Sequence, residues 1–308
     1  MYINTFNAAM QKRFGKKMYR LSLDYNFGCP NRDGAVGVGG CVFCSQPGAG
    51  NFAGRGETLD EKLTAAKEKI AAKAGGDCGY IAYFQSYTNT YAPIETLREI
   101  FTQAAEHPAV DALSIATRPD CLPPETLALL AEINRKKPIW VELGLQTANE
   151  ATAAYINRCY PLPVYDAAVR ELHARGVEVV THMILGLPRE TEEDMLHTAR
   201  HIAAVGSEGI KLQLLHVLKN TRLAEDFAKG AFDVLSMEAY ADILCAILPT
   251  LPRDMVIHRY TGDGDKRELI APLWSGDKKR TLNYINRILK ERDITQGSAV
   301  QGEANAEG

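Results

Sequence analysis

The chain has 308 residues, of which 46% are hydrophobic and 24% charged, so it can bury a sizeable core and is not broadly disordered. With 35 Lys and Arg against 38 Asp and Glu, its net charge of −3 excludes a protein that coats nucleic acid through overall positive charge. No apolar run approaches the roughly 18–20 residues that span a bilayer, and the first residues contain no signal-peptide core. We expect a soluble, cytoplasmic protein with no membrane partner.

Strand-like and helix-like runs alternate along most of the chain. The strand-like runs lie at 19–27, 79–86, 110–117, 139–146, 177–186 and 209–218. The helix-like runs lie at 57–74, 93–106, 123–135, 148–158, 164–175 and 190–205. Such alternation predicts a parallel sheet with right-handed crossovers, and six strand–helix units are too few to close an eight-stranded barrel. The sequence therefore predicts an α/β fold, an open, TIM-like (βα)6 partial barrel.

The last part of the chain predicts a smaller extension. It contains helix-like runs near 236–248 and 278–292 and a strand-like run at 254–259. The final residues, 296–308, are small and polar, which is typical of a disordered tail. We therefore expect a core at 1–218, an extension at 219–295 packed on this core, and a disordered tail at 296–308.

Polar residues recur at every second position of several strand-like runs, although a strand buried on both faces should be nearly all apolar. Residues two apart in a strand share a face. The sets are Arg20, Ser22, Asp24 and Asn26, then Tyr83 and Gln85, then Glu142 and Gln146, and finally Lys211 and Gln213. One interpretation is a solvent-facing antiparallel edge. We favour a wet central cavity whose hydrogen-bonding groups bind a polar cofactor and substrate.

Three of the seven cysteines, Cys29, Cys41 and Cys44, come directly after the first strand-like run. In an α/β barrel this loop lies on the carboxyl face, where active sites are built, and the glycines at 34–40 let it bend back tightly. A structural zinc site is closed by four ligands, and the sequence has no fourth Cys or His nearby. Three thiolates suit a [4Fe–4S] cluster with one iron open to a non-protein ligand. Zinc completed by a distant side chain, or three unrelated buried cysteines, are the alternatives.

The cysteine loop and five further sequence blocks resemble the radical S-adenosylmethionine (SAM) superfamily and, within it, the YhcC-like family. The blocks are YFQSYTNTYAP at 83–93, SIATRPDCLP at 114–123, WVELGLQT at 140–147, HMILGLP at 182–188 and IKLQLLHVLKNTRLA at 210–224. The resemblance spans about residues 1–295. The layout is more distantly similar to the catalytic subunit of Elongator and to the oxygen-independent coproporphyrinogen dehydrogenases.

The resemblance implies a [4Fe–4S] cluster on Cys29, Cys41 and Cys44 that binds SAM and cleaves it reductively to a 5′-deoxyadenosyl radical. It also implies a reductant such as flavodoxin or ferredoxin. Implied SAM contacts are Phe43 and Gly186 near the adenine, Gln85 or Ser86 at the amino group, Arg118 at a carboxylate, Glu142 and Gln146 at the ribose or amino group, and His182. Three of these have structural alternatives: a hydrophobic plug for Phe43, a salt bridge with Asp120 for Arg118, and a core histidine for His182.

Three residues depart from the family's usual pattern. Cys159 and Arg189 stand where the family usually has glycine, and Tyr160 stands where it usually has histidine. These departures would alter the substrate pocket or its rim, and none of them touches the cluster. Cys121 follows a strand end and would be either a hydrogen-atom donor or a structural thiol.

Three functions are compatible with these patterns. The first is a radical SAM enzyme acting on tRNA at a wobble-uridine side chain, which the Elongator resemblance implies. A basic segment at 11–20, with five positive charges, would then bind phosphates, although such runs are more often solvated faces. The second is a radical SAM enzyme for a small metabolite or tetrapyrrole, and the third is a non-catalytic iron–sulfur or zinc scaffold. We favour the first.

Overall fold

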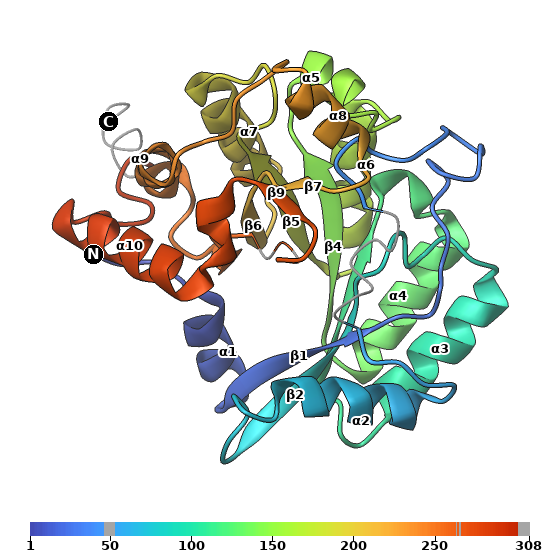
Figure 1. Cartoon of the computed structure of the whole chain (residues 1–308). Helices are drawn as coiled ribbons and strands as arrows, with labels where there is room; N and C mark the ends of the chain where they lie inside the picture. The colour runs from blue at the N-terminus through green and yellow to red at the C-terminus, as the bar shows by residue number, and fades with distance from the viewer. Residues whose placement is uncertain (46–52, 263, 265, 301–308) are drawn as a thin grey trace, which may run out of the picture.

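The computed structural model describes residues 1–45, 53–262, 264 and 266–300. Within these residues, seven parallel strands form the main sheet in the order β1-β2-β3-β4-β5-β6-β8. The sheet curls into a half-barrel that stays open between β1 and β8 (Figure 1). Its strands are β1 (Lys17–Leu23), β2 (Cys78–Phe84), β3 (Ala112–Thr117), β4 (Ile139–Gln146), β5 (Glu178–Leu185), β6 (Gly209–Leu214) and β8 (Val256–Arg259).

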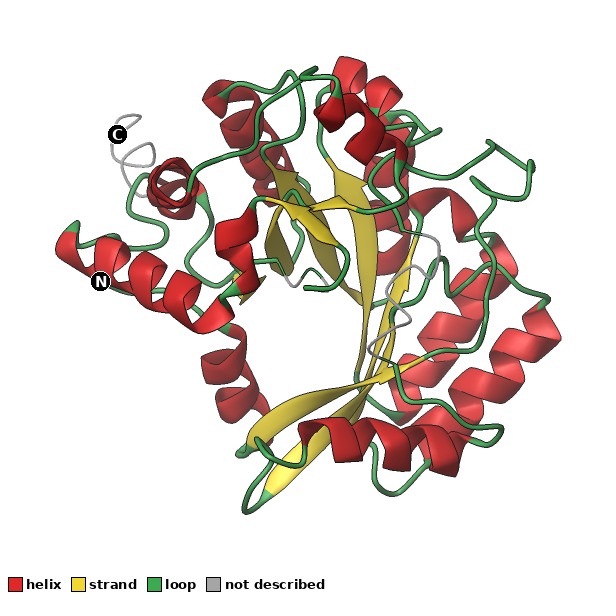
Figure 2. Cartoon of the chain, viewed as in Figure 1, coloured by secondary structure: helices red, strands yellow, loops and turns green. Residues whose placement is uncertain are grey.

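Helices cover the outer face of the half-barrel (Figure 2). They are α2 (Leu59–Ile70), α3 (Ile94–Glu106), α4 (Pro124–Lys136), α5 (Glu150–Tyr155), α6 (Leu162–His173) and α7 (Glu192–Ala204). Thr58 and Thr191 start α2 and α7 with capping boxes, which satisfy amide groups that a helix start leaves without partners. The predicted α/β partial barrel is confirmed.

Two strands differ from the sequence prediction. The strand expected at 254–259 joins the main sheet as β8, because it pairs with β6 through Gly209 and Ile210. The first strand ends at Leu23 rather than at residue 27. Asp24 Oδ1 accepts a hydrogen bond from Asn26 N (2.9 Å), and Asn26 has a left-handed φ of 55°, so a local turn replaces the ladder there.

The main hydrophobic core lies between the sheet and the helices that cover it. It includes Leu21 and Leu23 of β1, Leu113 of β3, Val141 of β4 and Phe101 of α3, none of which exposes any surface. Burial of these side chains is the main driving force that holds the helices on the sheet. The strands are therefore rigid supports for the loops at their carboxyl ends.

The remaining elements lie at the amino end of the chain and after β6. They are α1 (Phe6–Phe14), β7 (Val217–Leu218), α8 (Arg222–Ala228), α9 (Met237–Ile247), β9 (Leu269–Ala271) and α10 (Lys278–Glu291), with the short 3₁₀ turns η3 (Leu248–Thr250) and η4 (Leu273–Gly276). A further 3₁₀ turn, η2 (Pro119–Cys121), lies between β3 and α4. β7 pairs with β9 in a separate two-stranded antiparallel ladder. The division of the chain at residue 218 stays a prediction.

The N-terminal segment runs along the outer edge of β8. Ile257 N donates to Asn4 O (2.8 Å), and Thr5 and Ile257 form a parallel bridge. Gln296, which the sequence analysis assigns to the tail, is fully buried beside this segment. Its side chain accepts from Asn4 N (2.9 Å) and donates to Met255 O (2.8 Å). The chain is therefore packed at least as far as Gln296, whereas residues 301–308 lie outside the described residues.

Candidate active site

The cysteine loop leaves the carboxyl end of β1 and folds back on itself. Arg32 N donates to Cys29 O (2.8 Å), and Cys44 N donates to Cys41 O (3.0 Å). Between these turns the backbone of Gly37 lies so close to Asn31 that an added Cβ would stand 2.1 Å from Asn31 Oδ1. Glycine is therefore required for this close approach. The loop brings the three sequence-predicted cysteines to one region of the carboxyl face, as barrel active sites require.

An asparagine and the turn after α5 hold the cysteine loop in place. Asn31 Nδ2 donates to Asn157 O (2.6 Å) and lies 3.6 Å from Cys41 Sγ. In return, Asn157 Nδ2 donates to Gly40 O (2.8 Å). The buried Arg158 donates to Thr147 O (2.6 Å) just beyond the end of β4. The sequence reasoning missed Asn31, whose only signal is its position two residues after Cys29.

The three thiols are electrostatic neighbours. Burial raises the pKa of Cys41 to about 12, and Cys44 and Cys29 add to the shift while Arg118 opposes it. Burial also raises the pKa of Cys44, and Arg32 opposes that shift. Two guanidinium groups therefore favour the thiolate forms that bind metal. In the part of the chain that the structure describes, no three His, Cys, Asp or Glu side chains lie close enough to hold a single metal ion.

The donor set of this loop fits an iron–sulfur cluster. Each cysteine of such a cluster ligates its own iron, so the thiols need to be neighbours without converging on one point. The asparagine amide beside Cys41 can donate to cluster sulfur, and the two cations offset the negative charge that thiolates bring.

Arg32 and Arg118 are both held by further contacts. Arg32 Nη2 donates to Cys44 O (3.0 Å) and Ser45 O (2.8 Å), and its guanidinium lies 5.0 Å from the centre of the Tyr87 ring. Arg118 forms a bidentate salt bridge with Asp120 (2.9 and 2.7 Å). The salt bridge with Asp120, which is the structural alternative for Arg118, is therefore formed. Nε and Nη2 of its guanidinium already donate to this carboxylate.

Among the implied SAM contacts, Ser86 has a buried hydroxyl that could bond a polar group of a ligand. It is 1% exposed at the carboxyl end of β2, and its hydroxyl has no hydrogen-bond partner among the described residues. A buried hydroxyl left unpaired costs about 1–3 kcal/mol, which a polar ligand group would recover. The neighbouring Tyr87 is close enough to Cys44 and Cys29 for these thiols to raise the pKa of its phenol, after the larger effect of burial.

The other implied contacts at strand ends differ in their surroundings. Gln85 is half-buried and engaged by a neighbouring group. Gln146 follows a register shift in β4 and has a left-handed φ of 71°, a strained conformation for a residue with a side chain. Phe43 is half-buried against the apolar cluster that contains Val42 and Leu187, which agrees with the alternative that it is a hydrophobic plug. Gly186 has a φ of 83°, and an added Cβ would stand 2.8 Å from the Leu235 side chain.

The inner face of the half-barrel carries a buried polar network centred on Glu142. The fully buried carboxylate of Glu142 accepts from Tyr83 Oη (2.9 Å), Ser114 Oγ (2.7 Å) and His182 Nε2 (2.7 Å), and also from Lys211 Nζ. Burial alone would raise the pKa of Glu142, but Lys211 and His182 hold it well below its usual range. Burial lowers the pKa of Lys211 to about 7, against the opposing effect of Glu142.

The predicted polar inner face is therefore present, but its residues satisfy one another. Glu142 has four donors on its two oxygens, and His182 is held by Glu142 while its side chain is 17% exposed. Neither is available as a free ligand for SAM in this arrangement. Their part in a SAM site would be to hold neighbouring strands and side chains in place.

The basic segment at 11–20 does not present its charges on the carboxyl face. Arg13 pairs with Glu178, the first residue of β5 (2.7 Å), and Lys16 pairs with Asp111, just before β3 (2.7 Å). Arg20 points to the inner face, where it lies 2.8 Å from His258 Nδ1. Arg13 and Lys16 therefore lie at the amino ends of the strands, and Arg20 lies on the inner face of the half-barrel. These positions do not support the prediction that this segment binds phosphates.

The two departures from glycine both fall on left-handed backbone. Cys159 has a φ of 62° and Arg189 a φ of 71°, where glycine is unstrained. The Cys159 thiol lies 3.2 Å from Asn157 Oδ1, and the Arg189 guanidinium lies 4.9 Å from the centre of the Tyr155 ring. Both side chains are at the rim of the carboxyl face.

Cys121 is buried beside the Arg118–Asp120 pair. Burial raises the pKa of its thiol to about 12, and Asp120 adds to the shift. Its sulfur lies 3.8 Å from Asp120 Oδ1. These surroundings keep the thiol protonated, which both a structural thiol and a hydrogen-atom donor require.

Comparison with known families decides the class of this site. The family model described as the Radical SAM superfamily matches residues 27–202, which is more than half of the chain. The chain belongs to the radical SAM superfamily. A second model, the Radical_SAM C-terminal domain, matches residues 207–291. Members of this superfamily are enzymes that use a [4Fe–4S] cluster and SAM and need a reductant, so the enzyme class and cofactors are confirmed.

Relatives match nearly the whole of this radical SAM chain. The uncharacterised protein YtqA of Bacillus subtilis is 43% identical over 299 residues, covering 97% of this chain and 92% of its own. Protein YhcC of Escherichia coli is 33% identical over 299 residues, covering 97% and 95%.

The names of two more distant relatives denote a complex or an activity. Elongator complex protein 3 of Schizosaccharomyces pombe is 28% identical over 210 residues, covering 63% of this chain and 37% of its own. Archaeosine synthase subunit beta of Thermococcus kodakarensis is 24% identical over 262 residues, covering 83% and 79%.

A solved structure shares the fold of this radical SAM enzyme. The archaeal Elp3 of Methanocaldococcus infernus matches with a TM-score of 0.67 at 14% identity, covering 91% of this chain and 64% of that one. This chain thus spans less than two thirds of the Elp3 chain. Within the described residues, no helix has the length and apolar character needed to cross a membrane.

Proposed function

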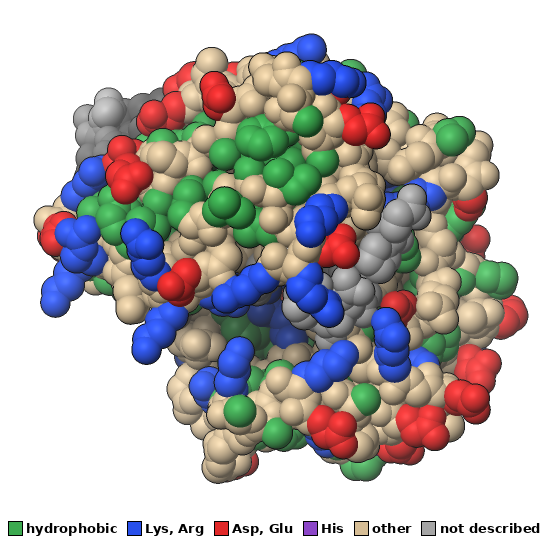
Figure 3. Space-filling model, viewed as in Figure 1, with side chains coloured by type: hydrophobic (Ala, Val, Ile, Leu, Met, Phe, Trp, Pro, Cys, Tyr) green, Lys and Arg blue, Asp and Glu red, His purple; other side chains and the backbone are tan. Residues whose placement is uncertain are grey.

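We propose that this radical SAM enzyme acts on tRNA, at the side chain of a wobble uridine. The proposal rests on the similarity to Elongator complex protein 3 and to archaeosine synthase subunit beta, whose name denotes synthesis of a modified nucleoside. The observation on this chain that carries it is a hollow with Lys and Arg side chains gathered around it (Figure 3). Cations around an opening attract a polyanion.

The residues of the carboxyl face would divide the work as follows. Cys29, Cys41 and Cys44 would bind the [4Fe–4S] cluster, and Ser86 would accept or donate a hydrogen bond at a polar group of SAM. When bound, cluster and SAM supply a 5′-deoxyadenosyl radical that removes a hydrogen atom from the substrate. Arg32 would help to balance the charge of the cluster. Asn31, through its bond to Asn157 O, would keep the cysteine loop in the position that this chemistry needs.

The polar network under this site would keep its floor rigid. Glu142 connects β2, β3, β4, β5 and β6 through its donors, so a change in one strand is resisted by four others. A rigid floor restricts where a bound substrate can lie, which matters for a radical that reacts with whatever carbon–hydrogen bond is nearest.

Anaerobic reconstitution followed by an assay for 5′-deoxyadenosine tests the proposal. The reductant would be flavodoxin or ferredoxin with its reductase, and the added substrate would be bulk tRNA from a strain that lacks this gene. We expect the tRNA to stimulate formation of 5′-deoxyadenosine and one of its nucleosides to change mass. Bulk tRNA from the parent strain, already modified, is the matched control and should stimulate less.

The alternatives are outcomes of the same assay. If tRNA has no effect while a small-molecule extract or a tetrapyrrole stimulates the reaction, the metabolite function replaces this one. A Cys41→Ala variant controls for adventitious SAM breakdown, because it should form no 5′-deoxyadenosine with any substrate.

A further inference from the structure

Seven basic residues form a surface that we call the basic ridge. All seven are exposed, and they follow one another through the elements after β6: Lys219, Arg222, Lys266, Arg267, Lys278, Lys279 and Arg280. From 266 to 280 the sequence has five basic residues and two acidic ones, Glu268 and Asp277. The ridge is therefore locally positive on a chain whose net charge is −3.

The first end of the basic ridge adjoins the cysteine loop. Arg222 lines a cavity together with Cys41 and Cys44. Behind it, Leu223 N donates to Val42 O (3.0 Å), so the start of α8 is bonded to the cysteine loop itself. Any polyanion on Arg222 would thus lie beside the catalytic centre.

Direct contacts continue the ridge away from the cysteines. Lys219 Nζ donates to Arg267 O (2.8 Å), and the strands on which these residues border, β7 and β9, pair with one another. β9 leads through η4 into the first turn of α10. The seven cations therefore belong to one continuous stretch of structure rather than to scattered sites.

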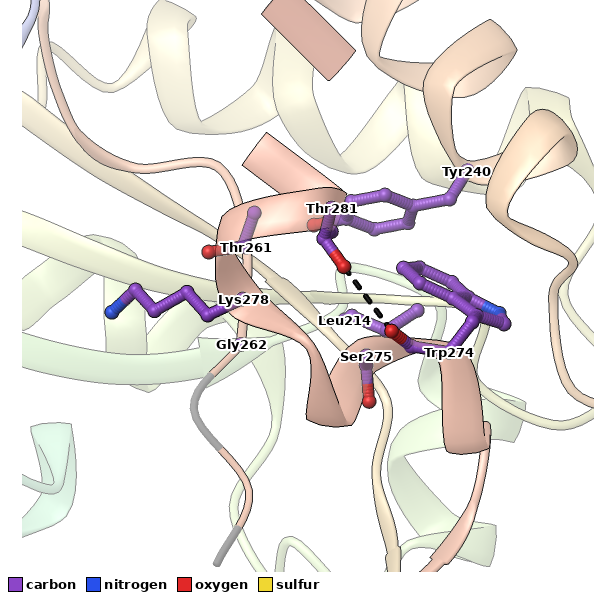
Figure 4. A pocket seen from close by; sticks show the side chains of 8 residues that line it. All are labelled: Leu214, Tyr240, Thr261, Gly262, Trp274, Ser275, Lys278 and Thr281. Carbon is purple, nitrogen blue, oxygen red and sulfur yellow. Dashed lines mark hydrogen bonds between the residues drawn. The ribbon is translucent and has the colours of Figure 1, made fainter. Parts of the chain in front are cut away.

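The far end of the basic ridge lies against the carboxyl ends of β6 and β8. Lys278 lines a pocket with Leu214, the last residue of β6, and with Thr261, two residues beyond β8. In Figure 4 its ammonium end points away from the rings of Tyr240 and Trp274. The ridge thus borders the same face of the half-barrel as the cysteine loop.

The charges of α10 are placed against the electrostatics of the helix. Lys278, Lys279 and Arg280 occupy its first turn, which contains no acidic residue. The amino end of a helix carries partial positive charge, so cations there are unfavourable in the isolated protein. Asp277 at the N-cap, which accepts from Arg280 N (3.0 Å), offsets only part of this charge. Lys279 and Arg280 therefore add their charge to the positive end of this helix.

We propose that the basic ridge binds the phosphate backbone of tRNA and sets the direction in which the anticodon loop approaches the cysteine loop. This inference rests on the proposed function, and it names the surface that the substrate uses. The segment at 11–20 lacks that role, because Arg13 and Lys16 pair at the amino ends of strands and Arg20 turns inward.

Binding of fluorescently labelled bulk tRNA to the reconstituted holoenzyme tests this inference, measured by anisotropy from 50 to 200 mM salt. The ridge variant is Lys278→Gln/Lys279→Gln/Arg280→Gln. The control variant, Lys12→Gln/Lys17→Gln/Arg135→Gln, makes the same change in charge with exposed residues at the amino ends of the strands. We expect about tenfold weaker binding by the ridge variant and a fall of about 2 in its salt slope, with the control within about twofold of wild type.

The possible outcomes separate the inference from the proposed function. Equal loss in both variants, or no loss in the ridge variant, overturns the ridge while tRNA binding by wild type leaves the proposed function standing. If wild-type enzyme binds no tRNA, both are overturned. Uncoupled formation of 5′-deoxyadenosine without tRNA should match wild type, which shows that the variant is folded. If it does not, Lys266→Gln/Arg267→Gln gives the same test on the neighbouring part of the ridge.

Discussion

Replacing Lys211 by methionine should destabilise the protein severely, because it leaves the Glu142 carboxylate buried without its cation. Glu142 exposes no surface and Lys211 only 4% of its side chain, so water cannot take the place of the lost partner. Breaking a buried ion pair from one side costs about 3–5 kcal/mol. The free energy of unfolding of a domain is about 5–15 kcal/mol, so Lys211→Met would remove a large part of it. Glu142→Gln should lower the free energy of unfolding by a similar amount, because it leaves the Lys211 ammonium buried without its carboxylate.

The double variant Glu142→Gln/Lys211→Met separates a coupled pair from two independent losses. With both charges gone, Tyr83 and His182 can still donate to the glutamine amide oxygen, and Ser114 Oγ can accept from the amide nitrogen. The methionine fills the space of the lysine stem. We expect the double variant to be more stable than the sum of the single losses predicts, by about 2–3 kcal/mol. Urea unfolding of all four proteins at pH 6, below the pKa of about 7 of Lys211, measures this difference while Lys211 is charged. If the losses add to within about 0.5 kcal/mol, Glu142 and Lys211 do not stabilise one another and the network is misassigned.

Three further predictions follow from other sites. Burial raises the pKa of Glu190 to about 7, so the folded state keeps a proton that the unfolded state releases above pH 4.5. Stability should therefore fall by about 3 kcal/mol as the pH rises from 4.5 to above 7, and Glu190→Gln should abolish this fall in urea unfolding at pH 5 and pH 8. Cys41→Ala should bind less iron and sulfide than wild type after reconstitution, with loss of the cluster's visible absorption; full retention of both would remove Cys41 from the ligand set. Lys279→Gln/Arg280→Gln should raise stability by about 1 kcal/mol at low salt, seen as a higher unfolding midpoint, because it removes two cations from the amino end of α10. A lower midpoint would show that these cations stabilise the helix.

The patterns that repeat along the chain predicted the fold and the position of the site. Alternating strands and helices were sufficient for the partial barrel, because parallel strands need helical crossovers. The position of the cysteine loop predicted that Cys29, Cys41 and Cys44 lie on the carboxyl face, because this loop follows the first strand directly. The polar alternation also correctly gave Tyr83, Glu142 and Lys211 the same face of the sheet.

What the sequence analysis missed depends on which strands become neighbours. The alternation does not say that Glu142 meets Lys211, because that contact requires the register of β4, β5 and β6 together. The inward turn of Arg20 likewise follows from its meeting with His258 on β8, a strand that was expected outside the main sheet. Arg32 near Cys44 depends on the fold of a glycine-rich loop, which local propensity does not determine. Residues that act through long-range neighbours are thus the ones that periodicity leaves unassigned.

The covering of β8 by the first few residues has a practical consequence for truncated versions of this protein. An uncovered edge strand offers free amide and carbonyl groups to any other chain with an extended segment. Deleting residues 1–5 would remove Asn4 O from Ile257 N and open that edge. Self-association that arises only after such a deletion would therefore report strand pairing between damaged copies, and would carry no information about the assembly of the intact enzyme.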